Sequence, residues 1–226
     1  MRLADKVVLV TGSATGIGRA IAVRCVAEGA RVVVHGLEAD LVAAVVVECG
    51  HENAVGHVED LVSAGCPGRL VDLAVDRFGR LDGVVNNAAV STPGSVHSTD
   101  ADAFARTMTV DALVPLQVIQ AALPRLRAVR GSVLNIGSVN AWCGEPNLLP
   151  YSISKAGLMT LTRNLGDVLF REDGVRVNQI NPGWVLTENE AARKRSHGMP
   201  DDWTARLPRD TSPAARLIRP EEKIGR

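Results

Sequence analysis

The sequence predicts a doubly wound α/β fold, in which helices cover both faces of a parallel sheet. Two observations carry this prediction. Short apolar runs alternate with helix-length segments along most of the chain, which is the order expected for repeated strand–helix–strand units. Several runs, such as "KVVLV" and "RVVVH", are almost continuous in Val, as expected for parallel strands that are buried on both faces.

The predicted elements follow one another without an internal repeat or a linker. Strands are expected at 6–10, 31–35, 53–58, 81–86, 132–136 and 175–180, and helices at 16–28, 38–49, 67–78, 99–126 and 151–170. The longest helix, 99–126, carries Thr99 and Asp102 at the spacing of a capping box. Pro115 predicts a kink within it, and Pro124 predicts that its end is near.

Composition limits the possible functions. A chain of 226 residues with 46% hydrophobic content can form one sizeable core, so we expect a single domain over 1–226. The 25 basic and 25 acidic residues give zero formal net charge without a long run of either sign, which argues against a nucleic-acid partner. The four cysteines form no CxxC pair, so neither a metal site nor a disulfide framework is implied.

The two ends of the chain lead to separate expectations. The first apolar run, Val7 to Val10, is too short for a signal peptide core or a membrane span, so we expect a cytoplasmic protein that makes no membrane contact. Between residues 183 and 219 the periodicity decays into charged and proline-containing sequence. We expect this segment to be mobile and to lie over a site.

A glycine-rich turn follows the first strand. In "TGSATGIG", Gly12, Gly16 and Gly18 stand where a strand passes into a helix, so backbone N–H groups and the positive end of the helix dipole would face an anion. Gly12 would permit the tight turn, Gly16 the close approach of a pyrophosphate, and Gly18 the packing of helix on sheet. A glycine-rich turn without a ligand is the alternative, and the absence of a following Lys excludes a Walker loop.

Tyr151 and Lys155, in "YSISK", are four residues apart and would share one face of a helix. An ammonium beside a phenol stabilises the phenolate, which would bring the pKa of Tyr151 toward the range of a general acid or base. A Tyr and a Lys at this spacing also occur in ordinary surface helices, so other motifs have to support the catalytic interpretation.

Five motifs in order supply that support. "TGSATGIG", "NNAA" (86–89), "NIGS" (135–138), "YSISK" (151–155) and "NPGWVLT" (181–187) make the chain resemble the short-chain dehydrogenase/reductase family from about Lys6 to Glu222. The resemblance implies a Rossmann-type sheet and hydride transfer between a nicotinamide cofactor, NAD(H) or NADP(H), and a small alcohol or carbonyl substrate.

The resemblance also implies roles for individual residues. Tyr151 would be the general acid/base, Lys155 would lower its pKa and bind the nicotinamide ribose, and Ser138 would orient the substrate oxygen. The residues expected to hold the cofactor are Gly12, Thr15, Gly16, Ile17, Gly18, Asn87, Ala88, Tyr151, Lys155, Pro182, Gly183 and Thr187.

Three features depart from the family pattern. The first is Asp111, which stands where the family has a catalytic Asn. An ionised Asp can only accept hydrogen bonds, but we nevertheless expect a catalytic role for it.

The second departure concerns the adenosine side of the cofactor. Gly36 and Leu37 stand where an Asp would bind the ribose 2′-OH, and neither Leu37 nor Thr15 offers a positive charge to a 2′-phosphate, which favours NAD weakly. His57 stands near the position where the family often has an Asp beside the adenine, and we expect it to be a strand-end residue.

The end of the chain is the third departure. "RLIRPEEKIGR" resembles the entry to the family's last helix, so we expect the final helix and strand to be missing. These elements commonly form a subunit interface in the family, so a homo-oligomer is possible but is not predicted.

Other functions fit less well. "HENAV" lacks the second His of HExxH, and "SISK" lacks the companion motifs of acylating serine enzymes. The remaining alternative is a catalytically impaired regulator or scaffold that binds a dinucleotide.

Overall fold

The computed structural model describes residues 1–196, 198–200, 202–207 and 216–224. Its sheet has six parallel strands in the order β3-β2-β1-β4-β5-β6. The strands are β1 (Val7–Val10), β2 (Arg31–Gly36), β3 (Ala54–Val58), β4 (Gly83–Asn86), β5 (Ser132–Ile136) and β6 (Arg176–Ile180). All six predicted strands are confirmed, and they differ from the prediction only at their ends.

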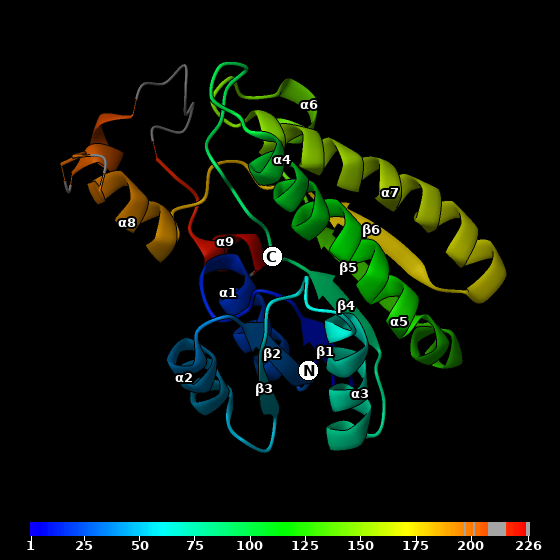
Figure 1. The fold of residues 1–226 in the computed structure, drawn as a ribbon. Helices are drawn as coiled ribbons and strands as arrows, with labels where there is room; N and C mark the ends of the chain where they lie inside the picture. The colour runs from blue at the N-terminus through cyan, green and yellow to red at the C-terminus, as the bar shows by residue number, and fades with distance from the viewer. Residues whose placement is uncertain (197, 201, 208–215, 225–226) are drawn as a thin grey trace.

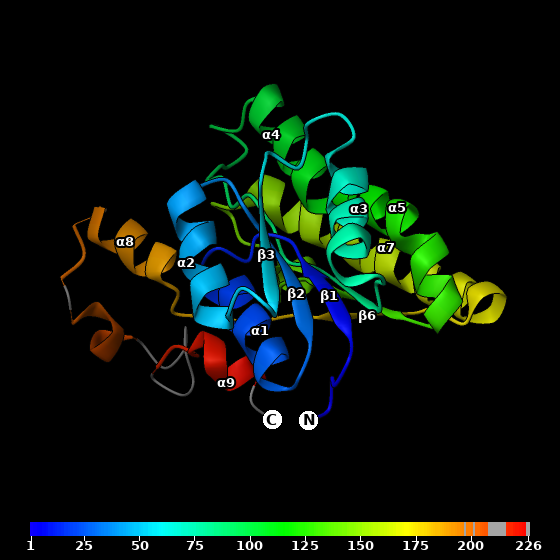
Figure 2. The ribbon, with the colours of Figure 1, turned by 90° about the horizontal axis from the view of Figure 1, so that it is seen from below.

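Helices cover the sheet on both faces. α1 (Gly16–Ala27) and α2 (Ala39–Cys49) lie on one side, and α3 (Cys66–Phe78), α5 (Val114–Val129) and α7 (Leu149–Asp173) lie on the other, as Figure 2 shows. The strand order reverses between β1 and β4, and in open α/β sheets the crevice at such a point, beyond the carboxyl ends of the strands, binds the ligand. The predicted doubly wound α/β fold is therefore confirmed.

The core lies in two layers, one on each face of the sheet, and β1 contributes side chains to both. Val7 and Leu9 belong to the cluster under α3 and α5, whereas Val8 and Val10 belong to the cluster under α1 and α2. Because successive side chains of a strand point to opposite faces, the unbroken run of valines and leucine fills both layers. This is the reason for the continuous apolar runs in the sequence.

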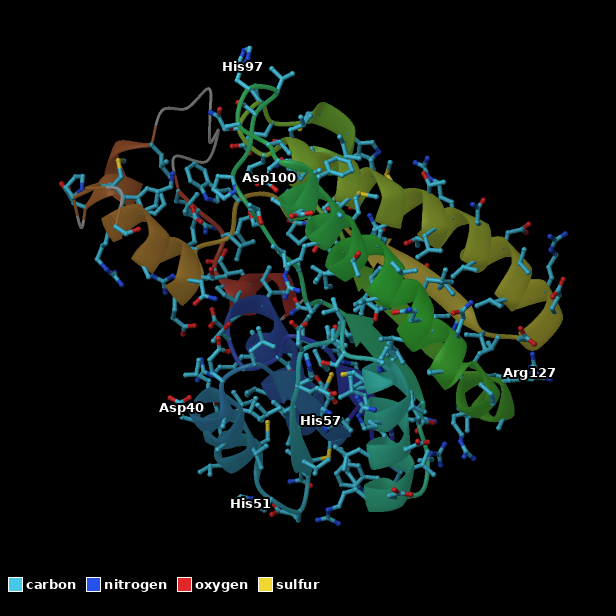
Figure 3. All side chains as sticks on the ribbon, viewed as in Figure 1. Asp40, His51, His57, His97, Asp100 and Arg127 are labelled. Carbon is cyan, nitrogen blue, oxygen red and sulfur yellow. The ribbon has the colours of Figure 1, made fainter. Side chains whose placement is uncertain are left out.

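The long helix predicted over 99–126 is wrong in its details. It consists of α4 (Ala101–Met108), a π-helical segment η1 (Thr109–Leu113) and α5, and Figure 1 shows α4 and α5 in one line. Asp100, labelled at the start of α4 in Figure 3, caps the helix by accepting a hydrogen bond of 2.8 Å from the Ala103 N–H. The expected capping box of Thr99 and Asp102 is not the cap that the structure uses.

The two prolines explain the other differences. Pro115 is the second residue of α5 and comes two positions after the π-helical segment, in the first turn of a helix, where the missing N–H of a proline is tolerated. Pro124 lies inside α5, which continues to Val129 and ends where Arg130 takes a left-handed conformation with φ of +51°. The end expected near residue 126 therefore comes slightly later.

The segment 183–219 contains regular structure in its described part. α8 (Glu188–Ser196) and the 3₁₀-helix η2 (Trp203–Arg206) lie there, and Val185 forms a parallel bridge with Ile218 just before α9 (Pro220–Ile224). Positions 197, 201 and 208–215 of the segment are outside the described residues, and its mobility stays a prediction. No helix among the described residues is long and apolar enough to cross a membrane.

Candidate active site

The glycine-rich turn between β1 and α1 has a backbone that only glycine adopts easily. Gly12 and Gly16 have φ values of +61° and +56°, in the left-handed region that L side chains rarely occupy. A Cβ on Gly12 would also lie 2.8 Å from the Ala88 Cα. The turn can therefore approach the end of β4 only because position 12 has no side chain.

Gly18 and Asn87 fix the turn against the sheet. The Asn87 Nδ2 donates hydrogen bonds of 2.9 Å to the Gly12 carbonyl and 3.1 Å to the Thr11 carbonyl. A Cβ on Gly18 would lie 2.3 Å from the same Gly12 oxygen and 2.5 Å from the Asn87 Nδ2. Gly18 is thus required by the close packing of α1 on the turn, whereas the sequence predicted that it allows the helix to pack on the sheet.

The N-terminus of α1 opens into a cavity of about 400 Å³. Thr15, the N-cap residue, makes no side-chain capping bond, so the first N–H groups of the helix are available to a ligand. Gly12, Thr15, Gly16, Ile17, Asn87, Ala88 and Thr187 all line this cavity. Unpaired N–H groups, a helix dipole and a cradle without side chains fit the pyrophosphate of a dinucleotide.

The far end of the same cavity contains two acidic residues that the sequence reasoning missed. Glu38 and Asp60 line the cavity with Gly36 and Leu37, whereas His57 does not. Figure 3 shows His57 on β3, consistent with the expectation of a strand residue. The signal for Glu38 was its position 20 residues after Gly18, which is the interval at which Rossmann folds place the acid that binds the ribose 2′-OH.

The two acids differ in their partners. The Asp60 carboxylate accepts a hydrogen bond of 2.9 Å from Arg106, which lowers the pKa of Asp60. Within the described part of the chain, no hydrogen bond or ion pair engages the Glu38 carboxylate. Glu38 is therefore the acid that is free to bind a ligand hydroxyl.

The side chain of His35, on β2, is hydrogen-bonded to the backbone of the glycine turn. Its Nδ1 accepts a hydrogen bond of 3.2 Å from the Gly12 N–H, and its Nε2 lies 2.9 Å from the Glu59 carbonyl oxygen. Only the neutral ring with its proton on Nε2 satisfies both contacts. Burial lowers the pKa of His35, so the neutral ring is also the favoured state.

Ser138, Tyr151 and Lys155 meet at a second cavity of about 220 Å³. Ser138 follows β5, and the other two residues project from one face of α7, so the carboxyl end of the sheet and the start of the helix bring them together. Pro182, Gly183 and Thr187 line the same cavity. Ile17, Asn87, Ala89 and Thr187 line both cavities, so the two form one extended crevice.

The pKa of Tyr151 differs from the expectation. This pKa is raised to about 12, mainly by burial; a hydrogen bond with Ser138 lowers it, and the negative charges of Asp111 and Glu145 contribute to the rise. The Lys155 Nζ lies 5.5 Å from the centre of the Tyr151 ring. The ammonium is thus near the phenol, as predicted, but the pKa is not lowered toward neutrality.

Lys155 and Asp111 are both completely enclosed by protein. The exposed fractions of their side chains are 2% and 0%, and the Nζ of Lys155 lies 3.9 Å from Oδ2 of Asp111. Lys155 also donates a hydrogen bond of 3.0 Å to the Ile136 carbonyl. Burial lowers the pKa of Lys155 while Asp111 raises it, and burial raises the pKa of Asp111 while Lys155 lowers it.

Asp111 and Gly18 are the two predicted site residues that line neither cavity. Oδ1 of Asp111 accepts a hydrogen bond of 2.7 Å from the Val90 N–H, and its Oδ2 accepts one of 2.9 Å from the Ser154 hydroxyl. Asp111 therefore stands behind Lys155, and any effect it has on the crevice passes through that residue.

A cluster of three side chains contains His57, Glu59 and Cys66, and Glu59 directly precedes Asp60, which lines the first cavity. Their ligand-type atoms lie within 4.8 Å of one another, although the sequence implied no metal site. Arg69 binds both carboxylate oxygens of Glu59, so a cation already neutralises that acid. Burial raises the pKa of Cys66 to about 12, which keeps the thiol protonated.

The family model for short chain dehydrogenases matches residues 6–198. The trans-4-hydroxycyclohexanecarboxylate dehydrogenase of Sinomonas cyclohexanicum is 34% identical over 87% of this chain and 79% of its own length. The 2-(S)-hydroxypropyl-CoM dehydrogenase 3 of Xanthobacter autotrophicus is 35% identical over 82% of this chain and 74% of its own length. The chain therefore belongs to the short chain dehydrogenase family of oxidoreductases, as its motifs indicated.

Solved structures agree with this assignment. A short-chain dehydrogenase/reductase of unknown function from Caenorhabditis elegans, solved with cofactor, superposes with a TM-score of 0.87 at 25% identity and covers 99% of this chain and 86% of its own. A 3-oxoacyl (acyl-carrier-protein) reductase from Agrobacterium tumefaciens, solved with NADP bound, gives a TM-score of 0.86 at 29% identity with the same two coverages.

Proposed function

We propose that this chain transfers a hydride between a nicotinamide cofactor and a secondary alcohol or ketone, with Tyr151 as the general acid/base. One observation carries the proposal: Ser138, Tyr151 and Lys155 line a cavity that is continuous with the glycine cradle. The glycine cradle at α1 would hold the pyrophosphate of a dinucleotide, and Ser138, Tyr151 and Lys155 would face its nicotinamide end.

Each residue of the second cavity has a distinct task. In reduction, Tyr151 donates its proton to the substrate oxygen, and in oxidation it accepts that proton. Ser138 hydrogen-bonds the same oxygen and orients it, and Lys155 places a positive charge beside the phenol. The bound nicotinamide supplies or accepts the hydride. Lys155 is buried and Tyr151 is partly buried, so little water surrounds the ammonium, and this strengthens these electrostatic effects.

NAD(H) is the cofactor that the adenosine end favours. Among the residues that the structure describes, the Glu38 carboxylate at this end has no protein partner, and the one Lys or Arg that lines the cavity, Arg106, is bound to Asp60. A carboxylate accepts hydrogen bonds from ribose hydroxyls but repels a 2′-phosphate. The proposed preference for NAD(H) therefore rests on Glu38, in addition to the missing positive charge at Leu37 and Thr15.

The substrate class follows from the family and from the relatives. Both dehydrogenases compared above are named for hydroxy compounds, which fits a proton exchange between Tyr151 and a hydroxyl. We propose a small secondary alcohol or its ketone as the substrate of this chain.

Tyr151→Phe tests the assignment. Removal of the phenol hydroxyl should lower kcat by about two to four orders of magnitude, the usual contribution of general acid–base catalysis. Dinucleotide binding, measured by calorimetry, should change little because the ring remains. Hydride transfer is followed by the absorbance of the reduced nicotinamide over a panel of alcohols and ketones with both cofactors.

Phe170→Leu is a suitable control, since Phe170 is an exposed aromatic residue of the same helix and lines neither cavity. It should leave activity and binding unchanged. A wild-type chain that binds a dinucleotide but turns over no member of the panel would contradict the proposal and would support a regulator or scaffold instead.

A further inference from the structure

Asp111 brings a second charge to the site that an Asn in the same place would not bring. Its carboxylate is 3.9 Å from the Lys155 ammonium, and both groups are buried. Two opposite charges at this distance interact strongly where water is excluded. The charge that Lys155 can offer to Tyr151 therefore depends on the charge of Asp111.

The hydrogen bonds of Asp111 keep its carboxylate in place. The Val90 N–H donates to Oδ1, and the Ser154 hydroxyl approaches Oδ2 at 2.9 Å. The Ser154 hydroxyl also lies 2.8 Å from the Tyr151 carbonyl, and its single proton can satisfy only one of these acceptors at a time. The Lys155 ammonium is thus the main partner of the charge on Oδ2.

The charged groups around the phenol come from several elements. Asp111 faces Lys155 from η1, and Glu145 approaches Tyr151 from the loop before α7. Glu190, on α8, lines the same cavity and is hydrogen-bonded to the Trp184 ring N–H. Lys155 is the one positive charge that lines the cavity within the described residues, so a buried negative charge beside it has a direct effect on the phenol.

We propose that Asp111 is a positioning residue that pairs with the Lys155 ammonium and withholds part of its charge from Tyr151, so that the phenol releases its proton at higher pH than it would beside an uncharged residue 111. This inference rests on the proposed function. Its consequence is that Tyr151 stays protonated at neutral pH and is ready to donate its proton to a ketone, whereas alcohol oxidation needs alkaline conditions.

The chain allows a direct measurement, because Tyr151 is its only tyrosine. The near-ultraviolet absorbance of tyrosinate therefore reports the titration of this phenol alone, and Tyr151→Phe gives the blank. The measurement needs neither cofactor nor substrate, so it can fail independently of the proposed function. Circular dichroism at each pH establishes the range over which the fold is intact.

Asp111→Asn is the decisive variant, because it removes the charge and keeps the shape. The midpoint of the tyrosinate titration should fall by about one pH unit or more, the size of shift that one charge at close range causes. The pH at which alcohol oxidation reaches half its maximum should fall with it. Glu145→Gln is the control: Glu145 is exposed, so its removal should lower the midpoint by less.

An unchanged or higher midpoint in Asp111→Asn would overturn the proposal. Lys155→Met provides a second test if that variant folds poorly. Asp111 stays ionised at the alkaline pH of this titration, so removal of the ammonium leaves its negative charge without an offsetting charge, and the midpoint should rise by about one unit or more. An unchanged or lower midpoint in Lys155→Met would show that the charge pair does not act on Tyr151, and would also overturn the proposal.

Discussion

Gly18→Ala should destabilise the protein, although alanine is the better helix former. The added Cβ would lie 2.3 Å from the Gly12 carbonyl oxygen and 2.5 Å from the Asn87 Nδ2, both closer than van der Waals contact. Relief requires α1 to move or Asn87 to leave its two hydrogen bonds with the turn. The clash therefore acts on the glycine turn, which we propose holds the cofactor.

The expected magnitude follows from three contributions. Overpacking costs about 1–3 kcal/mol, the loss of the Asn87 hydrogen bonds costs about 1 kcal/mol each, and the helix propensity of alanine returns about 1 kcal/mol. The net loss is about 2–4 kcal/mol. For a chain of this length it corresponds to a fall in Tm of about 4–16 °C, and dinucleotide affinity should fall because the turn itself is displaced.

Gly68→Ala is the matched control. Gly68 is the third residue of α3, as Gly18 is the third residue of α1, and a Cβ at Gly68 would meet no atom within 4 Å. This variant should be stabilised by about 0.4–1 kcal/mol, because alanine reduces the freedom of the unfolded chain. Thermal unfolding by circular dichroism compares the two variants with the wild type. A Gly18→Ala protein as stable as Gly68→Ala would refute the reasoning.

Two further predictions concern His35 and Glu38, which both line the first cavity. The pKa of His35 lies below its ordinary value of 6.5, so the unfolded state binds the proton first, and the stability contributed by the neutral ring is lost as the pH falls below about 6.5. Urea unfolding between neutral pH and about pH 5 should show this loss. His35→Gln should reduce the dependence of the unfolding free energy on pH. Glu38→Gln should tighten NADP(H) binding by about fivefold, as expected for removal of one exposed like charge. In parallel calorimetric titrations, NAD(H) binding should be nearly unchanged. Equal effects on the two cofactors would place Glu38 away from the 2′-position.

The sequence by itself determined the parts of this protein that depend on neighbours along the chain. The nearly continuous apolar runs predicted β1 and β2, because a strand that is buried on both faces needs apolar side chains at successive positions. The glycines of the turn and the spacing of Tyr151 and Lys155 are also local features, since φ and the helical repeat decide them. These predictions needed no knowledge of which segments meet in space.

The division of the long helix shows where local patterns lose their power. The periodicity over 99–126 is helical throughout, and it does not reveal that Thr109–Leu113 is a π-helix or that Asp100 is the cap. Asp111 lies in this π-helical segment and accepts hydrogen bonds from Val90 and Ser154. Those contacts join residues that are far apart in the sequence.

Only the tertiary structure decided the electrostatics of the site. The sequence placed a positive charge beside a phenol, but the strength of that charge depends on burial and on Asp111, which arrives from another helix. Glu38 lines the same cavity as Asp60, and His35 accepts a hydrogen bond from the Gly12 N–H. Both arrangements bring together elements that are separate in the sequence. A pKa is set by solvent access and by distances through space, and these exist only once the chain has folded.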